Sequence, residues 1–136
     1  MWLWGPVIAY AAVIFAASSI AQPPMPGGVS DVALHGWAYA GLAAIVLRAL
    51  ARARWDRVTL GRAVIAVLAA TAYGLSDELH QRLVPGRFFD LRDLLADAVG
   101  AAAGAGAVYI GSSIRLLAGR GRSRSPHDDV PSVDLT

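Results

Sequence analysis

The sequence contains no cysteine and no lysine, and it has few charged residues of any kind. Without cysteine the chain has no disulfide framework, no thiolate zinc site and no cysteine nucleophile. Charged residues make up 16% of the 136 residues, well below the roughly 25% of an average soluble protein. The 12 basic residues are all arginine and leave a net charge of only +2. This composition argues against a disordered chain or a highly charged nucleic-acid binder, and we expect no nucleic-acid partner.

Long apolar runs take the place of the missing charge, and 56% of the residues are apolar. Four runs are long enough, at 1.5 Å per residue, to cross a hydrocarbon core of ~30 Å; they cover residues 3–21, 34–50, 60–76 and 94–114. We therefore predict an all-α membrane protein in which four transmembrane helices form a compact bundle, a single domain of residues 1–118. A soluble bundle is the alternative, but so short a chain has too little polar surface to coat four such helices.

The first apolar run has a second interpretation, a cleaved signal peptide. Ser19, Ile20 and Ala21 provide the small residues that a cleavage site needs. Residues 1–4, however, contain none of the basic residues that normally precede such a run. We therefore expect this helix to stay in the protein and to end at the proline- and glycine-rich residues 22–28.

The arginines predict how the helices are oriented. Five lie in and beside the loop between the second and third spans (Arg48, Arg52, Arg54, Arg57 and Arg62), and four follow the last span (Arg115, Arg120, Arg122 and Arg124). The positive-inside rule places both groups, and so both termini, in the cytoplasm, and it leaves the first and third loops outside. The tail of residues 119–136 is expected to be a disordered cytoplasmic extension. We assign no role to its His127.

The densest polar stretch of the chain, residues 76–87, begins where the third span ends. If the helix continues into this stretch, Asp77, His80 and Gln81 share one face at i, i+3 and i+4 spacing. Glu78 then lies on the next face, four positions before Arg82, as a helical ion pair requires.

The end of this stretch is expected to turn the chain. Pro85 and Gly86 stop a helix and allow a tight turn. Arg87 follows the turn directly. It can fold back toward the carboxylates or present its planar guanidinium to an anion.

The fourth span begins with a related stripe of residues. Asp93, Asp97, Gly100 and Gly104 are separated by four, three and four positions, so they lie on one helical face. Gly100 and Gly104 form a surface of small residues for helix packing, because they let another helix approach closely. Asp97 lies about one turn inside the span, where a charge is costly. We expect it to face protein or a watery cavity, paired with an arginine or protonated.

Asp31 and His35 form an i, i+4 pair at the outer end of the second span, on the same side of the membrane. We expect the polar residues of this side to converge in a ligand-binding site that comprises Asp31, His35, Asp77, Glu78, His80, Gln81, Arg87, Asp93 and Asp97. Interfacial anchoring by mixed charges is the alternative. A metal site of His35, His80 and carboxylates is disfavoured because no HExxH or other paired-histidine spacing is present, so we expect no metal and no cofactor.

These residues resemble the motif of the VanZ-like family, small bacterial integral membrane proteins named for a member linked to low-level teicoplanin resistance. The family pattern is approximately D-E-x-x-Q-x-x-x-P-x-R followed by D-x-x-x-N-x-x-G-x-x-x-G. It is matched by Asp77, Glu78, Gln81, Pro85, Arg87, Asp93, Gly100 and Gly104. Residues 14–19 resemble the end of the family's first helix, and residues 31–35 resemble the start of its second, so the resemblance covers roughly residues 7–111.

Two positions depart from the family pattern. Val32 stands where the family usually has lysine, and Asp97 stands where it usually has asparagine. Both changes remove positive or add negative charge at the outer rim. They would weaken binding of an anion unless Asp97 is protonated.

The resemblance implies a multi-pass protein of the bacterial cytoplasmic (inner) membrane that is associated with the cell envelope and, in some members, affects glycopeptide sensitivity. We expect an extracytoplasmic polar site that binds a lipid headgroup or a lipid-linked envelope component. In that site Arg87 would hold an anionic oxygen, and His80 and Gln81 would donate hydrogen bonds.

Two alternatives remain open at this point. The first is a membrane-embedded enzyme, a hydrolase or headgroup transferase, with Asp77, Glu78 and His80 as candidate catalytic residues. The second is a structural protein whose Gly100 and Gly104 face binds another membrane protein or a second copy of the chain.

Overall fold

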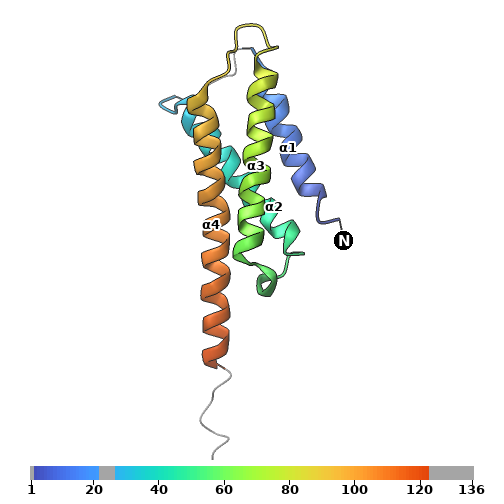
Figure 1. The fold of residues 1–136 in the computed structure, drawn as a ribbon, viewed down its shortest axis with the longest axis vertical. Coiled ribbons are helices and arrows are strands. Elements are labelled where there is room, and N and C mark those ends of the chain that lie inside the picture. The colour runs from blue at the N-terminus through green and yellow to red at the C-terminus, as the bar shows by residue number, and fades with distance from the viewer. Residues whose placement is uncertain (1, 22–26, 123–136) are drawn as a thin grey trace, which may run out of the picture.

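A computed structural model describes residues 2–21 and 27–122, and these residues are helical apart from their connecting segments. Figure 1 shows the elements α1 (Gly5–Ser18), α2 (Asp31–Leu50), η1 (Trp55–Arg57), α3 (Leu60–Gln81) and α4 (Leu91–Arg122). η1 is a single 3₁₀ turn. The prediction of an all-α protein is confirmed for the described part of the chain.

Three of the helices, α2, α3 and α4, are long and apolar enough to cross a membrane. They contain the second, third and fourth predicted spans. α1 differs from the predicted first span of residues 3–21, because its helix has only 14 residues. At 1.5 Å per residue this is about 21 Å, less than a hydrocarbon core of ~30 Å. A span made by α1 therefore stays a prediction.

The helix ends follow local signals in the sequence. Ser30 begins α2 by accepting a hydrogen bond from the backbone N–H of Ala33 at 3.2 Å, and Thr59 begins α3 in the same way through Arg62 at 3.3 Å. Such hydroxyl caps satisfy backbone donors that the first helical turn leaves unpaired. After α3 the chain turns at Gly86, whose φ of +81° is a conformation that suits glycine.

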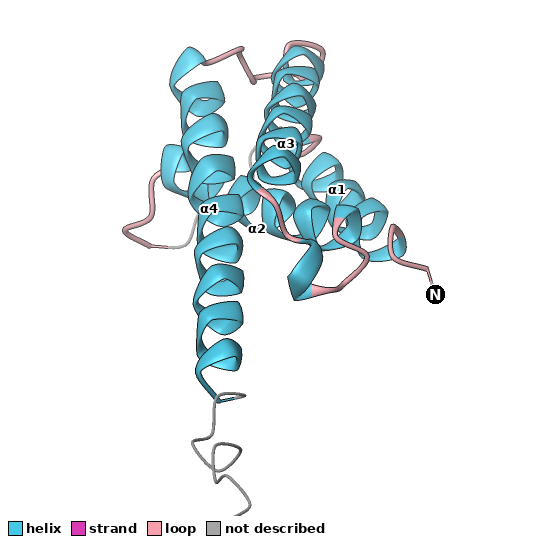
Figure 2. Cartoon of the chain, turned by 60° about the horizontal axis from the view of Figure 1, so that its bottom comes forward, coloured by secondary structure: helices cyan, strands magenta, loops and turns pink. Residues whose placement is uncertain are grey.

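Two helices extend beyond the predicted spans. α3 continues past Ser76 to Gln81, so the polar stretch is helical up to that residue. α4 continues to Arg122, past the domain boundary expected at residue 118. Figure 2 shows that this end of α4 extends beyond the other helices. The rest of the expected tail, including His127, lies outside the described residues.

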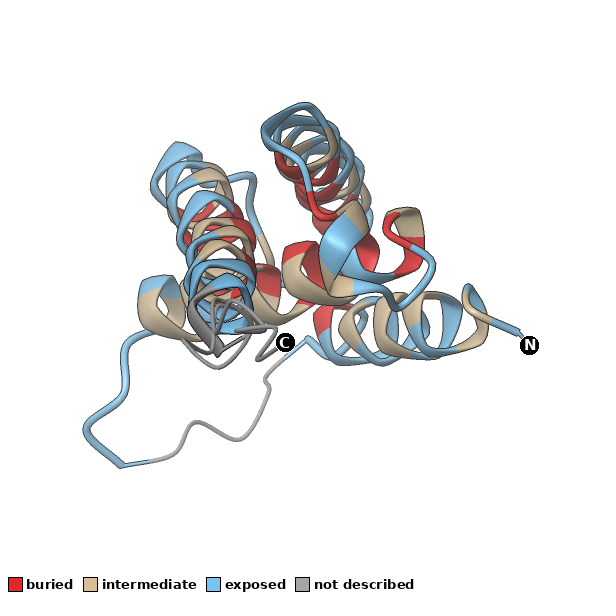
Figure 3. Ribbon diagram, turned by 90° about the horizontal axis from the view of Figure 1, so that it is seen from below, coloured by how far each residue is buried: buried red, intermediate tan, exposed pale blue. Residues whose placement is uncertain are grey.

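α2 is the central helix and packs against each of the other three (Figure 3). Its closest approach is to α4, at two glycines. A side-chain carbon on Gly100 would overlap the carbonyl oxygen of Gly36, and one on Gly104 would overlap that of Ala40. The small-residue face of α4 is thus occupied by α2 of the same chain. The interpretation that this face binds a partner protein or a second copy of the chain stays a prediction.

The arginine-rich loop between α2 and α3 lies at one end of the molecule, against α4. The guanidinium carbons of Arg48 and Arg115 lie 5.7 and 4.7 Å from the centre of the Trp55 ring. Arg54 donates two hydrogen bonds to Asp56, at 3.1 and 2.7 Å, and these lower the pKa of the Asp56 carboxyl. Arg115, the first arginine after the last predicted span, therefore lies at the same end as this loop, as a common cytoplasmic side requires.

Candidate functional site

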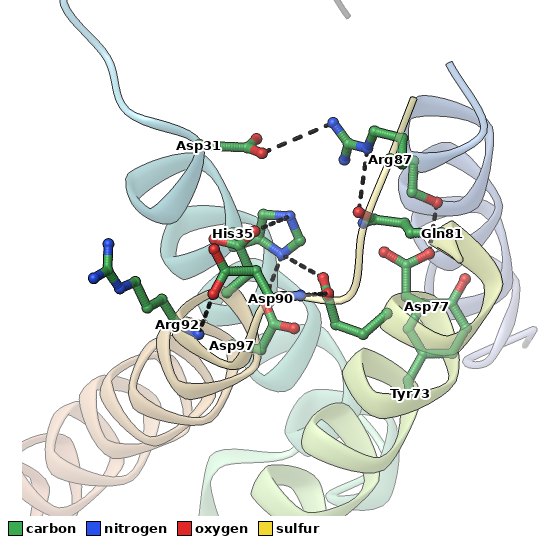
Figure 4. Close-up of polar contacts among 12 residues, drawn as sticks. Asp31, His35, Tyr73, Asp77, Gln81, Arg87, Asp90, Arg92 and Asp97 are labelled. Carbon is green, nitrogen blue, oxygen red and sulfur yellow. Dashed lines mark hydrogen bonds and ion pairs between the residues drawn. The ribbon is translucent and has the colours of Figure 1, made fainter. Parts of the chain in front are cut away.

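The candidate site lies at the opposite end, where the first turns of α2 and α4 meet the last turns of α3 (Figure 4). α2 contributes Asp31 and His35. α3 and the loop after it contribute Asp77, Glu78, Gln81 and Arg87, and α4 contributes Asp93 and Asp97. The structure thus brings together all the predicted site residues except His80, although they come from segments far apart in the sequence.

His35 lies at the centre of the cluster. Its Nδ1 is 3.0 Å from Asp97 Oδ1 and 3.9 Å from Glu78 Oε1. Its Nε2 is 4.0 Å from Asp93 Oδ2. One imidazole on α2 therefore faces carboxylates from α3 and α4. Glu78 and Asp97 are fully buried, and only 9% of His35 is exposed.

Asp97 faces protein, as its position inside the predicted span requires, but its partner is His35 and not an arginine. Gly74 of α3 makes room for this carboxylate, because a side-chain carbon there would press against Asp97. Asp97 Oδ2 has no hydrogen-bond partner among the described residues. A buried carboxylate oxygen without a partner is costly and calls for a physical explanation.

Glu78 does not pair with Arg82, although helical spacing predicted this pair. The carboxylate points inward, and Oε2 accepts a hydrogen bond from the backbone N–H of Asp90 at 3.0 Å. Its Oε1 has no hydrogen-bond partner in the part of the chain that the structure describes. Arg82 is exposed. The inward face of α3 is set by its packing between α2 and α4, and it carries Gly74, Asp77, Glu78 and Gln81.

Asp77 is held from the side of α1. The Ser18 hydroxyl donates a buried hydrogen bond of 2.6 Å to Asp77 Oδ1. His80, which was expected in the same site, lies away from His35. Its Nε2 is 3.1 Å from the Ser19 hydroxyl, and its ring centre is 4.4 Å from that of Phe15. His80 therefore joins α3 to α1, because its position on the helix points toward that neighbour.

Arg87 folds back over the cluster, the first of the two possibilities that the sequence left open. Its Nε donates to Gln81 Oε1 at 3.2 Å, and its Nη1 is 3.8 Å from Asp31 Oδ2. The Arg87 side chain is 12% exposed, whereas that of Asp31 is 43% exposed. The guanidinium is thus fixed by a buried amide on one side and loosely paired with a solvent-facing carboxylate on the other.

A cavity of about 470 Å³ opens beside the cluster, between α1 and α2. Most of its wall is apolar and comes from residues such as Tyr10, Val13, Ile14, Leu34 and Ala38. Its polar lining comes from Ser18, Asp31, His35, Asp77 and Arg87. A pocket with apolar walls and a few polar groups at one place fits a ligand that is itself amphiphilic.

Three residues of this site were not predicted. Ser18 holds Asp77, Gly74 accommodates Asp97, and Tyr39 lines the cavity one helical turn after His35. The rings of Tyr39 and His35 are nearly parallel, with centres 6.3 Å apart. Tyr39 follows His35 by four positions, a spacing that could have revealed it. Nothing in the sequence alone indicates that Gly74 faces Asp97.

The comparisons with known proteins assign the central part of the chain to a family. The sequence model of the VanZ/LLP1 family matches residues 34–112. This range contains His35, Glu78, Arg87, Asp97 and the glycines that pack α4 on α2, whereas α1 and Asp31 precede it. No curated protein and no solved structure matches the chain.

Proposed function

Because the chain belongs to the VanZ/LLP1 family, we propose that it is a multi-pass protein of the bacterial cytoplasmic membrane that binds a headgroup at its extracytoplasmic end. The ligand is a membrane lipid or a lipid-linked envelope component. The cavity between α1 and α2 carries this proposal, since it joins an apolar wall to a polar end within about 470 Å³.

The apolar wall suits an acyl or isoprenoid chain, and the polar end suits a headgroup. Arg87 is the group that would recognise an anionic oxygen. Its guanidinium is anchored by Gln81 at 3.2 Å but makes only a loose contact of 3.8 Å with Asp31. A pair of this kind with an exposed carboxylate contributes little stability. A phosphate or carboxylate of the ligand can therefore replace Asp31 and take two parallel hydrogen bonds from the planar fork.

The charge distribution supports the proposed orientation. The arginine-rich loop and the arginines at the C-terminal end of α4 belong on the cytoplasmic side under the positive-inside rule. The site lies at the other end, where headgroups of the outer leaflet are accessible. An effect on glycopeptide sensitivity would follow if the bound component is one that these antibiotics meet outside the membrane.

The test is native mass spectrometry of the detergent-purified full chain with a panel of lipids. The panel contains anionic and zwitterionic phospholipids and an isoprenoid-linked phosphate. The wild-type chain is expected to retain one member of the panel. Arg87→Ala should lower this retention at least about tenfold, the scale of one lost charge-assisted contact. Arg87→Lys should restore it only in part, because lysine has no planar fork.

Arg82→Ala is the matched control, since it removes an exposed arginine from the same segment. Equal retention by the Arg87→Ala and Arg82→Ala variants would contradict the proposed headgroup site.

The same experiment addresses the enzyme alternative, which the buried carboxylates Glu78 and Asp97 beside His35 favour. An enzyme would return a ligand of altered mass, and Glu78→Gln would abolish that change.

A further inference from the structure

We propose that His35, Glu78 and Asp97 form a binding site for a divalent transition-metal ion between α2, α3 and α4. One ligand atom from each of these residues lies within 4.8 Å of the other two. The Nδ1 atom of His35 is the shared neighbour, at 3.0 Å from Asp97 Oδ1 and 3.9 Å from Glu78 Oε1. An ion placed among these atoms needs only small side-chain movements to reach coordination distances of about 2.0–2.2 Å.

A second observation points to a missing cation. Glu78 and Asp97 are fully buried. Within the described residues, Glu78 Oε1 and Asp97 Oδ2 have no hydrogen-bond partner. Burying a charged oxygen without a partner costs several kcal/mol in general. A metal ion at this site supplies the partner that Glu78 Oε1 lacks, and its charge also offsets that of the buried Asp97 carboxylate.

The surroundings of the three residues suit metal ligation. The backbone N–H of Asp90 holds Glu78 Oε2 at 3.0 Å, which leaves Oε1 directed at His35. Asp93 Oδ2 lies 4.0 Å from His35 Nε2. If Nδ1 binds a metal, Nε2 carries the proton, and a small side-chain movement would let it donate a hydrogen bond to Asp93. A carboxylate behind the imidazole is the usual way in which proteins orient a metal-binding histidine.

The charge balance of the cluster also favours a cation. The buried carboxylates of Glu78, Asp93 and Asp97 surround one imidazole, and Asp77 is buried on the same inward face of α3 as Glu78. Arg87, which also belongs to the cluster, is engaged with Gln81 and Asp31. A bound dication would offset this excess of negative charge. It would also reduce the repulsion that an anionic headgroup meets on entering the neighbouring cavity.

The donor set indicates the kind of metal. One imidazole nitrogen and two carboxylate oxygens, without sulfur, suit Zn²⁺ or Mn²⁺. Three protein ligands leave at least one coordination position open. His35 also lines the cavity between α1 and α2, so the proposed metal site lies beside the proposed ligand site. The sequence disfavours a metal site here because His35 and Asp97 are 62 positions apart and fit no metal-binding motif.

The experiment uses the full chain in detergent, purified without a histidine tag and stripped of metal with EDTA. Zn²⁺ and Mn²⁺ are titrated separately by calorimetry, and bound metal is counted by elemental mass spectrometry. We expect one ion per chain and a higher melting temperature with metal. Glu78→Gln should weaken binding by about 100-fold or more, since loss of even an outer partner typically costs about 10- to 100-fold. The double variant Glu78→Gln/Asp97→Asn should not bind.

Two further variants keep the result interpretable. Asp56→Asn removes an exposed carboxylate at the other end of the molecule and should leave metal binding unchanged. Asp31→Asn tests the outer group of Asp31, His35 and Asp93, whose ligand atoms also lie within 4.8 Å of one another. Metal binding lost in Asp31→Asn but kept in Glu78→Gln would overturn the proposed site, as would a folded wild-type chain that binds no ion. The titration contains no lipid, so its failure leaves the proposed headgroup binding to its own test.

Discussion

At the scale of single residues, the two departures from the VanZ pattern have less effect on an anion site than their charges imply. Asp97 adds a carboxylate, but this carboxylate is fully buried and contacts His35. Val32 stands where the family usually has lysine. It lies on a side of α2 that does not line the cavity to which Arg87 belongs. Neither change therefore alters the guanidinium that would hold a headgroup. The carboxylate at residue 97 instead provides a ligand that an asparagine would replace poorly in a metal site.

A residue-scale prediction concerns the segment that follows α2. Arg52 and Ala53 have φ values of 53° and 56°, in the left-handed region. A side chain in this conformation costs roughly 1–2 kcal/mol, a cost that glycine avoids. We expect Ala53→Gly to stabilise the protein by about 1 kcal/mol, a few degrees in melting temperature. Thermal unfolding in detergent measures this shift.

The control for this substitution is Ala49→Gly, which places glycine in the last helical turn of α2. It should lower the melting temperature, because glycine costs a helix about 1 kcal/mol relative to alanine and Ala49 is buried. If both variants lower the melting temperature equally, the left-handed conformation at Ala53 contributes no strain and the prediction is wrong.

At the scale of helices, the contact between α2 and α4 depends on two glycines. Because a side-chain carbon on Gly104 would overlap the Ala40 carbonyl, Gly104→Leu forces the helices apart. We expect a loss of about 2 kcal/mol or more in unfolding free energy, at the upper part of the range for overpacked cores. The site suffers as well, since Asp97 on α4 and His35 on α2 would separate.

Gly106→Leu is a matched control on the same helix, because nothing lies within 4 Å of a side-chain carbon at that position. It should change stability by no more than about 0.5 kcal/mol in the unfavourable direction. Thermal unfolding of both variants in one detergent makes the comparison. Equal stability of the two variants would show that close approach at Gly104 is not needed.

The sequence predicts the helices better than it predicts which of their faces meet. Hydropathy located α2, α3 and α4 because a run of apolar residues is sufficient to define them. Helical spacing predicted that Glu78 pairs with Arg82 and that His80 belongs to the site. Both predictions are wrong because spacing alone does not say where the neighbouring helices lie. Glu78 is buried between α2 and α4, and His80 instead contacts Ser19 at the end of α1. The predicted first span of residues 3–21 is also longer than α1, because apolar residues continue beyond both ends of the helix.

At the scale of the whole molecule, the polar groups are separated into two ends. The arginines beside Trp55 gather at one end, and the carboxylates around His35 gather at the other. The apolar parts of α2, α3 and α4 lie between them. This arrangement suits the proposed membrane protein, in which the arginine end would set the orientation and the opposite end would bind the ligand.

The predicted orientation can be measured directly because the chain has no cysteine. Leu83→Cys introduces a thiol at a residue that is 80% exposed, in the loop beside the site. Asp56→Cys introduces one in the arginine-rich loop and leaves every arginine in place, so the orientation signal is kept. Arginines decide topology far more than acidic residues do, and removing Asp56 should not disturb it.

The two single-cysteine variants are labelled in intact cells with a maleimide that cannot cross the cytoplasmic membrane. The Leu83→Cys variant should be labelled directly, and the Asp56→Cys variant should be labelled only after permeabilisation. The reverse labelling pattern would show that the topology is opposite to the prediction. The site would then face the cytoplasm, where outer-leaflet headgroups cannot reach Arg87. Labelling of both variants in intact cells would mean that the segments between residues 56 and 83 do not cross the membrane.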